Sequence, residues 1–182
     1  MADEPHVNTY FVAAVAAALS ACTAELGATT QEVTGDPVVD CPVVDPTAIA
    51  GHEATFYRCA EQTLHCGPDG YLIGYGARYA ERFYRQTRPW MSPRGQHWID
   101  ATLVCLQRTL HERIDETTSC GDVRTRAFDS HPECYVDAGF CQLPLSDWFA
   151  VAVTIDGRDW LSRDAQRQVT ATANACLFGI DP

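Results

Sequence analysis

The sequence predicts an all-α domain held together by disulfide bonds, and three observations lead to this fold class. Hydrophobic residues recur with helical spacing through most of the chain, and the run 151–155 is the only strand candidate. Eight of the nine cysteines lie after residue 40, and an even set is what a fully oxidised framework needs. The 182 residues, 46% of them hydrophobic, suffice for one domain with a core. We expect about five to six helices in a cystine-rich domain spanning residues 46–182.

The N-terminal residues 1–21 are similar to the signal peptide of a bacterial lipoprotein. The apolar run 11–19 is too short to span a bilayer and suits the core of a signal peptide. It leads into Leu-Ser-Ala-Cys ending at Cys22, which resembles a lipobox and implies that Cys22 is lipidated. The first ten residues carry Asp3 and Glu4 and no basic residue, so an ordinary N-terminal helix or a disordered tail is the alternative. A retained Cys22 thiol could instead pair two chains.

Residues 22–45 are rich in Thr, Val, Pro and Asp and show no helical period. We interpret them as a lipidated tether and an irregular lead-in that Cys41 ties down. Asp36, Asp40 and Asp45 could hold calcium loosely, although their spacing is not that of an EF-hand. A solvated acidic surface is the favoured interpretation.

Three helices are expected in the first half of the domain. The first covers residues 48–64 and ends before a strong turn at 66–70. The second covers residues 71–87, with its arginines at 78, 82 and 85 facing solvent and with Gly74 and Gly76 weakening its first turns. The third begins at Ser92-Pro93, an N-cap followed by proline at the first helical position, and its apolar spacing continues to residue 114.

Three more helices are expected in the second half. Ser119 caps a fourth helix, Pro132 restarts or kinks it, and Gly139 ends it. Cys134 and Cys141, seven residues apart, are placed on one helical face. Ser146-Asp147 opens a fifth helix over residues 148–155, and a turn follows at 156–157. Ser162 caps the last helix, over residues 163–176, before a stop at residue 179.

The net charge of −11 makes nucleic acid an unlikely partner, because binding phosphates needs a basic face. No cofactor or metal site is predicted. His111-Glu112 resembles the start of a zincin motif, but the position of the second histidine is Asp115, so His111 is expected to be an exposed helix residue. The cysteines include no Cys-x-x-Cys pair, which disfavours zinc ribbons and thioredoxin-type redox sites. His131, beside Pro132 between two expected helices, is expected to cap or pack there.

The cysteine pattern resembles that of the stanniocalcin family of secreted glycoprotein hormones. The similarity covers Cys41 to Cys176 and rests on the spacing of the cysteines and on three local sequences: Cys66 with Asp69-Gly70-Tyr71, Leu103-Val104-Cys105-Leu106, and Cys134-Tyr135 followed by Cys141. The resemblance implies an all-α fold and the pairs Cys41–Cys59, Cys66–Cys120, Cys105–Cys134 and Cys141–Cys176. One family cystine, the family sequon and the inter-chain cysteine are missing, so a covalent dimer of the family type is not expected.

These observations favour an exported, non-enzymatic binding module, anchored by a lipid on Cys22 in the cell envelope or on the outer surface. It would be secreted if Cys22 is not lipidated. Family members bind other extracellular proteins, so the expected partner is an unidentified extracellular or envelope protein, with signalling or protease inhibition as the model. One alternative is a structural or calcium-linked envelope protein. Another is an envelope hydrolase that uses scattered residues such as His97, Asp100, Asp129 and His131.

Overall fold

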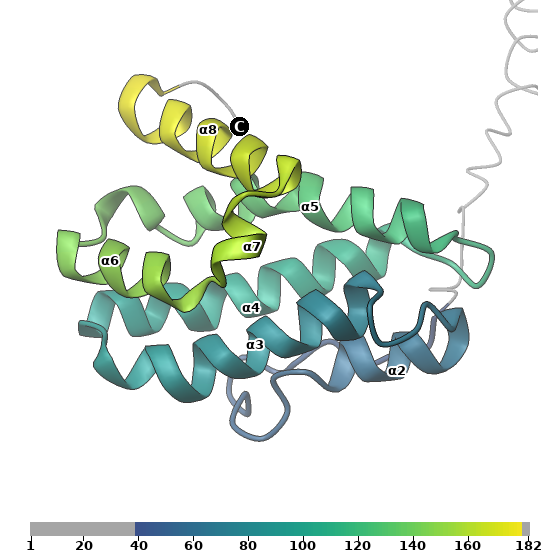
Figure 1. Cartoon of the computed structure of the whole chain (residues 1–182). Helices are drawn as coiled ribbons and strands as arrows, with labels where there is room; N and C mark the ends of the chain where they lie inside the picture. Colours follow the sequence, from purple (N-terminus) through teal and green to yellow (C-terminus); the bar gives the residue numbers. More distant parts are fainter. Residues whose placement is uncertain (1–38, 180–182) are drawn as a thin grey trace, which may run out of the picture. The chain divides into compact units, whose positions relative to one another are not determined.

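The computed structural model of the chain describes residues 39–179 (Figure 1). The expected signal peptide, Cys22, Asp36 and most of the tether lie outside these residues. Within residues 39–179 there are seven α-helices and no strand, so the all-α prediction is confirmed. The helices are α2 (Thr55–Leu64), α3 (Arg78–Arg82), α4 (Pro93–Arg113), α5 (Cys120–Asp137), α6 (Leu145–Thr154), α7 (Gly157–Trp160) and α8 (Arg163–Phe178).

Helices α4 and α5 lie against each other in the middle of the domain (Figure 1). The segment that contains α3 packs against α2 on one side of this pair, and α8 lies on α5 on the other side. All six expected helices are present. The single turn α7 is additional, at the position where the sequence predicts only a turn. We refer to the last three helices, α6, α7 and α8, as the cover.

The first expected helix begins later than predicted. The predicted start was residue 48, but residues 45–54 form successive turns and α2 begins only at Thr55. Gly51 adopts a left-handed backbone with φ of 83°, which interrupts a right-handed helix. Glu53 is buried in this turn and binds Arg85 through its carboxylate. This turn therefore carries a buried charge.

Several other predicted details are wrong. Helix α5 is a single element that continues through Pro132 to Asp137, so His131 lies inside a helix and not between two. Cys134 and Cys141 do not share a helical face, because Gly139 ends the helical region at φ of 100° and Cys141 lies in a 3₁₀ turn. The strand candidate 151–155 falls almost wholly within α6, which starts at Leu145. Tertiary packing therefore decides these positions.

The segment from residue 71 to residue 90 is helical but wider than a regular α-helix on both sides of α3. Residues Tyr71–Ala77 and Phe83–Thr87 form π-helical turns, with α3 between them and a 3₁₀ turn at Arg88–Trp90. A side chain at Gly76 would collide with the ring of Tyr57 on α2. Gly76 therefore permits the close approach of this segment to α2, at the helix start that the two glycines were expected to weaken.

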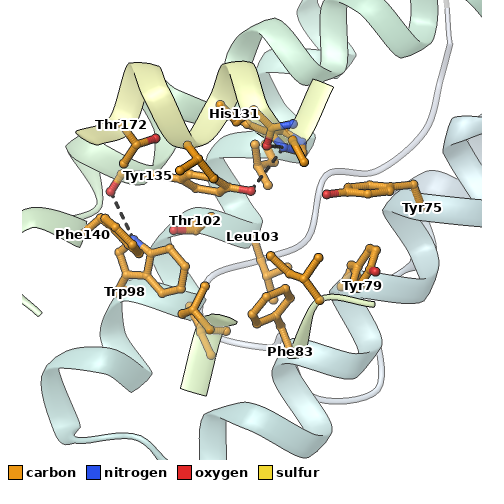
Figure 2. A pocket seen from close by; sticks show the side chains of 18 of the residues that line it. Tyr75, Tyr79, Phe83, Trp98, Thr102, Leu103, His131, Tyr135, Phe140 and Thr172 are labelled. Carbon is orange, nitrogen blue, oxygen red and sulfur yellow. Dashed lines mark hydrogen bonds between the residues drawn. The ribbon is translucent and has the colours of Figure 1, made fainter. Parts of the chain in front are cut away.

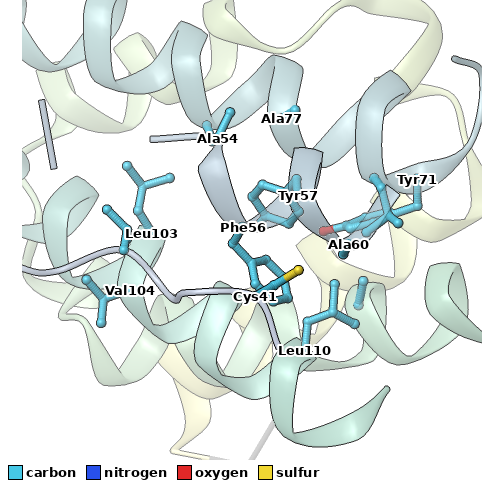
Figure 3. Packing of buried hydrophobic residues seen from close by; sticks show 14 of the residues in the cluster. Cys41, Ala54, Phe56, Tyr57, Ala60, Tyr71, Ala77, Leu103, Val104 and Leu110 are labelled. Atoms are coloured by element: carbon cyan, nitrogen blue, oxygen red, sulfur yellow. The ribbon is translucent and has the colours of Figure 1, made fainter. Parts of the chain in front are cut away.

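The core lies between α2, the 71–90 segment and α4 (Figure 3). Phe56 and Tyr57 of α2 are almost fully buried and pack edge-on at 5.4 Å between ring centroids. Leu72 and Leu110 are buried with them. Each such side chain contributes about 1.5–3 kcal/mol on burial. Gln107, fully buried on α4, accepts from the Val44 amide and donates to the Glu53 carbonyl, which fixes the lead-in on this core.

Four disulfides join the elements: Cys41–Cys59, Cys66–Cys120, Cys105–Cys134 and Cys141–Cys176. These are the four pairs that the stanniocalcin resemblance implies. Cys105–Cys134 joins the central helices α4 and α5, and Cys141–Cys176 joins the turn after α5 to the end of α8. The last bond matters most for α8, since the only residues that this helix buries fully are Gln168 and Thr172, both polar.

We predict that the double variant Cys141→Ser/Cys176→Ser loses about 3–4 kcal/mol of unfolding free energy, the chain-entropy value for a closed loop of 35 residues. Chemical denaturation measures this loss, and limited proteolysis should cut α8 first. The control, Cys41→Ser/Cys59→Ser, should lose similar stability while α8 stays resistant to proteolysis. A Cys141/Cys176 variant whose α8 is cut no faster than in the wild type would contradict the role given to this disulfide.

Candidate functional site

A cavity of about 290 Å³ lies beneath the cover formed by α6, α7 and α8 (Figure 2). Its walls come from the 71–90 segment, α4, α5 and these three helices, and Tyr57 of α2 and Phe140 of the turn after α5 complete the lining. The lining is aromatic and aliphatic, with a few neutral polar groups, and contains no Asp, Glu, Lys or Arg. A mainly apolar pocket with a few polar groups is the usual form of a small-molecule site.

Three of the four tryptophans line this cavity, and each has its indole N–H satisfied elsewhere. Trp98 donates to the Tyr135 carbonyl at 3.1 Å, Trp148 to the Phe140 carbonyl at 3.0 Å, and Trp160 to the Ala152 carbonyl at 2.9 Å. Because the polar edge of each ring is anchored in this way, the rings form fixed apolar walls. Trp90, by contrast, is 87% exposed.

A buried hydrogen-bond network lies at the wall formed by α5 and α8 (Figure 2). The two ring nitrogens of His131 contact the Tyr71 hydroxyl at 2.9 Å and Gln168 Oε1 at 2.8 Å, and the Tyr135 hydroxyl lies 3.2 Å from the second nitrogen. Since Gln168 Oε1 only accepts, we assign the proton of His131 to Nδ1 and the Tyr71 O–H as donor to Nε2. Burial lowers the pKa of His131 to about 4, although the Gln168 bond opposes this shift. His131 is therefore neutral at pH 7.

Three buried polar atoms on the cavity lining have no hydrogen-bond partner. They are Thr102 Oγ1 on α4 and Thr172 Oγ1 and Gln168 Nε2 on α8. Buried polar groups in proteins are almost always paired, because an unpaired one costs about 1–3 kcal/mol. Because all three belong to residues that line one cavity, they are the groups that a small side-chain rotation would present to an occupant.

An ion-pair cluster closes the α7 side of the cavity. The guanidinium of Arg78 donates to Asp156 at 2.9 Å and to Asp159 at 2.6 Å, and Arg82 donates to Asp156 at 2.6 Å. The hydroxyl of Tyr79, a lining residue, donates to Asp159 at 2.5 Å and accepts from the Asp156 amide. Arg85 is exposed as predicted, but Arg78 and Arg82 are half-buried and do not simply face solvent. They fasten the α6–α7 turn to α3.

Helix α6 is apolar on two opposite sides. Trp148 and Val151 line the cavity, and so does Ile155, which is the C-terminal cap of the helix. On the other side Leu145 and Phe149 are exposed by 78% and 69%, and Val153 is also exposed. These three are spaced four residues apart and form one row along the helix. We call this row the outer face of α6.

The only charged residue of α6 is turned inward. Asp147 is buried and accepts from the backbone amide and the hydroxyl of Ser92, at 3.1 and 2.5 Å. A side chain at Gly95 would collide with this carboxylate. Asp147 therefore fixes the start of α6 on the start of α4 and leaves the outer face without charge.

The residues of the hydrolase hypothesis do not form a hydrogen-bonded group. His97 and Asp129 are exposed, Asp100 binds Arg88 through two hydrogen bonds of 2.7 Å, and His131 is buried in its own network. Among residues 39–179 no cluster of three His, Cys, Asp or Glu side chains could hold a metal ion.

Asp40, Asp45 and His111 also lie apart from the cavity lining. Asp45 accepts from Thr47 and Asp40 is exposed. His111, expected to be an exposed helix residue, is half-buried and packs against the ring of Phe56.

Of the polar residues of the cavity only His131 was a candidate from the sequence, and Thr102, Gln168 and Thr172 were not predicted, although a signal was present. Thr102 follows Trp98 by four residues, and Gln168, Thr172 and Cys176 are also spaced four apart. Such spacing places each polar residue on the face that carries a core tryptophan or a disulfide. Polar residues on an inward face are the observation that would have indicated the site.

No family model, no curated protein and no solved structure matches this chain. Within residues 39–179 no helix is both long and apolar enough to cross a membrane. The four disulfides are consistent with an extracellular or exported protein, because such bonds persist in oxidising compartments.

We predict that the domain loses stability as the pH falls from about 6.5 to about 4. In this window the unfolded state binds a proton at His131 and the folded state does not, so acid favours unfolding. The expected loss between pH 7 and pH 4 is about 3 kcal/mol, measured by urea denaturation at each pH. Tyr71 and Tyr135 stay protonated throughout, since burial raises the pKa of both.

The control for this prediction is His131→Asn, which removes the titrating group. Its stability should be lower at pH 7 but should vary much less between pH 6.5 and pH 4.5. A variant with the same pH slope as the wild type would show that other groups cause the dependence.

Proposed function

We propose that this chain is an exported, non-enzymatic binding module, held at a membrane surface by a lipid on Cys22, that contacts a protein partner through the outer face of α6. The observation that carries the proposal is the exposed apolar row Leu145, Phe149 and Val153 on a helix whose opposite side already faces the domain interior. A helix that is apolar on all sides is normally buried on all sides. We therefore expect a binding partner to bury the outer face.

The chemistry of the outer face favours a protein over a lipid surface. Helices that lie in a membrane interface carry Lys and Arg on their polar side, whereas α6 contains neither. Three apolar residues at positions i, i+4 and i+8 are the anchors of a helix that binds in a groove of another protein. Aromatic and aliphatic side chains without charge are also typical of the centre of such interfaces.

The resemblance to stanniocalcins supports a binding role of this kind. The domain is all-α, and its four disulfides pair as the resemblance implies. Family members act by binding other extracellular proteins. A rigid, disulfide-linked domain suits such a role, because little conformational entropy is lost when it binds.

We predict that a photo-crosslinking residue at Phe149, in cells that make the full chain, captures one protein of defined mass. The same residue at Asp129, exposed on α5, should not capture it. The variant Val153→Glu, carrying the same crosslinker, should lose the product because it places an uncompensated charge in the interface. Circular dichroism and the melting temperature should stay unchanged, since Val153 is exposed.

Three outcomes would overturn the choice of partner. A crosslinked product of twice the mass of this chain would identify a second copy as the occupant. Equal crosslinking from Phe149 and Asp129 would show that the outer face has no specific role. Binding of the lipid-free domain to phospholipid vesicles, lost in Val153→Glu, would assign the face to a membrane instead.

The anchor is tested separately. We predict that Cys22→Ser moves the protein from the membrane fraction to the soluble fraction, because the lipid is the proposed attachment. Fractionation followed by mass spectrometry measures this, and the folded stability should be unchanged. A Cys22→Ser protein that stays with the membrane would contradict lipidation at this position.

A further inference from the structure

We infer that the cavity beneath α6, α7 and α8 is a binding site for a neutral, mainly apolar small molecule that carries one uncharged hydrogen-bonding group. This inference is independent of the partner proposed for the outer face of α6, since it rests on the opposite side of that helix. Four features of the cavity carry it: its volume, the lack of charge in its lining, its unpaired polar atoms and the weak attachment of one wall.

The volume of the cavity suits a ligand larger than a single ring. An apolar cavity of about 150 Å³ stays dry and binds benzene. The cavity of about 290 Å³ has roughly twice that space and reaches the lower end of the range of small-molecule pockets, about 300 Å³. A chain of ten or so carbon atoms, or two fused rings, is the appropriate size class.

The lining excludes a charged ligand. It contains no acidic or basic side chain apart from His131, and both ring nitrogens of His131 are engaged by Tyr71, Tyr135 and Gln168. A charged group in this cavity would have no counter-charge, and an unpaired buried charge is strongly unfavourable. The charges nearest in the fold, on Arg78 and Asp159, are paired with each other.

The unpaired polar atoms specify the head group. Thr102 Oγ1 and Thr172 Oγ1 can each donate or accept, and Gln168 Nε2 donates. A hydroxyl or carbonyl oxygen on the ligand would pair with these groups and recover the cost of leaving them unsatisfied. The three atoms come from α4 and α8, so such a ligand would also join these two helices.

The α8 wall offers the route of entry. Its only buried residues are Gln168 and Thr172, whereas on the same wall Ala165 and Ala173 are half-buried and Val169 is exposed. Outward movement of α8 therefore exposes little apolar surface that is now covered, and the Cys141–Cys176 disulfide limits that movement at one end.

Four probes of equal chain length test the inference on the full oxidised protein: 1-decanol, decane, decylamine and decanoate. Binding is measured by quenching of tryptophan fluorescence and by the shift in melting temperature. We expect 1-decanol to bind at least tenfold more tightly than the ammonium or carboxylate probe, and several-fold more tightly than decane.

Two variants separate the head-group site from the cavity itself. The double variant Thr102→Val/Thr172→Val keeps the shape of both side chains and removes two unpaired hydroxyls, so it should fold with equal or higher stability. It should bind decane as the wild type does and lose the preference for 1-decanol. Ala173→Leu fills the cavity and should abolish binding of every probe, whereas Ala171→Leu, outside the cavity lining, should not.

Three results would overturn the inference. If no probe binds the wild type, the cavity is not a ligand site. If the charged probes bind as well as 1-decanol, the exclusion of charge is wrong. If Ala173→Leu binds as well as Ala171→Leu does, the probes bind elsewhere. None of these results bears on crosslinking at Phe149, so this inference and the proposed function fail separately.

Discussion

The disulfide between Cys141 and Cys176 is the constraint on which the candidate site depends. Helix α8 forms one wall of the cavity, yet the only residues that it buries fully are Gln168 and Thr172. Apolar burial alone therefore holds this helix weakly. Its attachment comes from the disulfide at its C-terminal end, from the hydrogen bond between Gln168 and His131, and from the ion pair between Asp164 and Arg124 near its start. These fixed points keep a wall in place over a space that no side chain fills.

An unfilled cavity lowers the free energy of unfolding, and the disulfides explain how the domain tolerates this loss. With a cost of about 24 cal/mol per Å³ for a closed cavity, a volume of about 290 Å³ would forfeit at most about 7 kcal/mol of packing, and the loss is smaller here because Val169 and Leu177 of the lining are exposed. Two disulfides of about 3–4 kcal/mol each are enough to offset this loss. Two further features keep the lining apolar. His131 is neutral, and the indole N–H groups of the lining tryptophans bind backbone carbonyls, so neither a charge nor a free indole N–H faces the cavity. A stable domain with a large, uncharged internal space is what ligand binding requires, and α6 separates this space from the face proposed for a protein partner.

Local signals in the sequence predicted the helices well and the cavity not at all. The start of α4 at Pro93, capped by Ser92, and the caps of α5 and α8 at Ser119 and Ser162 are set by neighbouring residues, so the sequence alone predicts them. The late start of α2 at Thr55 and the uninterrupted α5 depend on contacts made by residues far apart, such as Glu53 with Arg85 and Tyr71 with His131. The cavity is lined by residues from eight separate segments, and no local pattern encodes a volume. The polar residues of the lining left only an indirect signal in the sequence. Gln168 and Thr172 are spaced four residues apart, on the helical face that also carries Cys176.

The measurement that tests the central claim most directly is hydrogen exchange of the oxidised protein with and without 1-decanol, followed residue by residue. If the cavity is a site covered by α8, the amides of α8 and of α4 around Thr102 should become more protected when the ligand binds, while the amide of Val44, in the lead-in outside the cavity lining, should not change. Protection that rises equally in all helices, or not at all in α8, would contradict the account, because it would show that the probe does not bind beneath this wall.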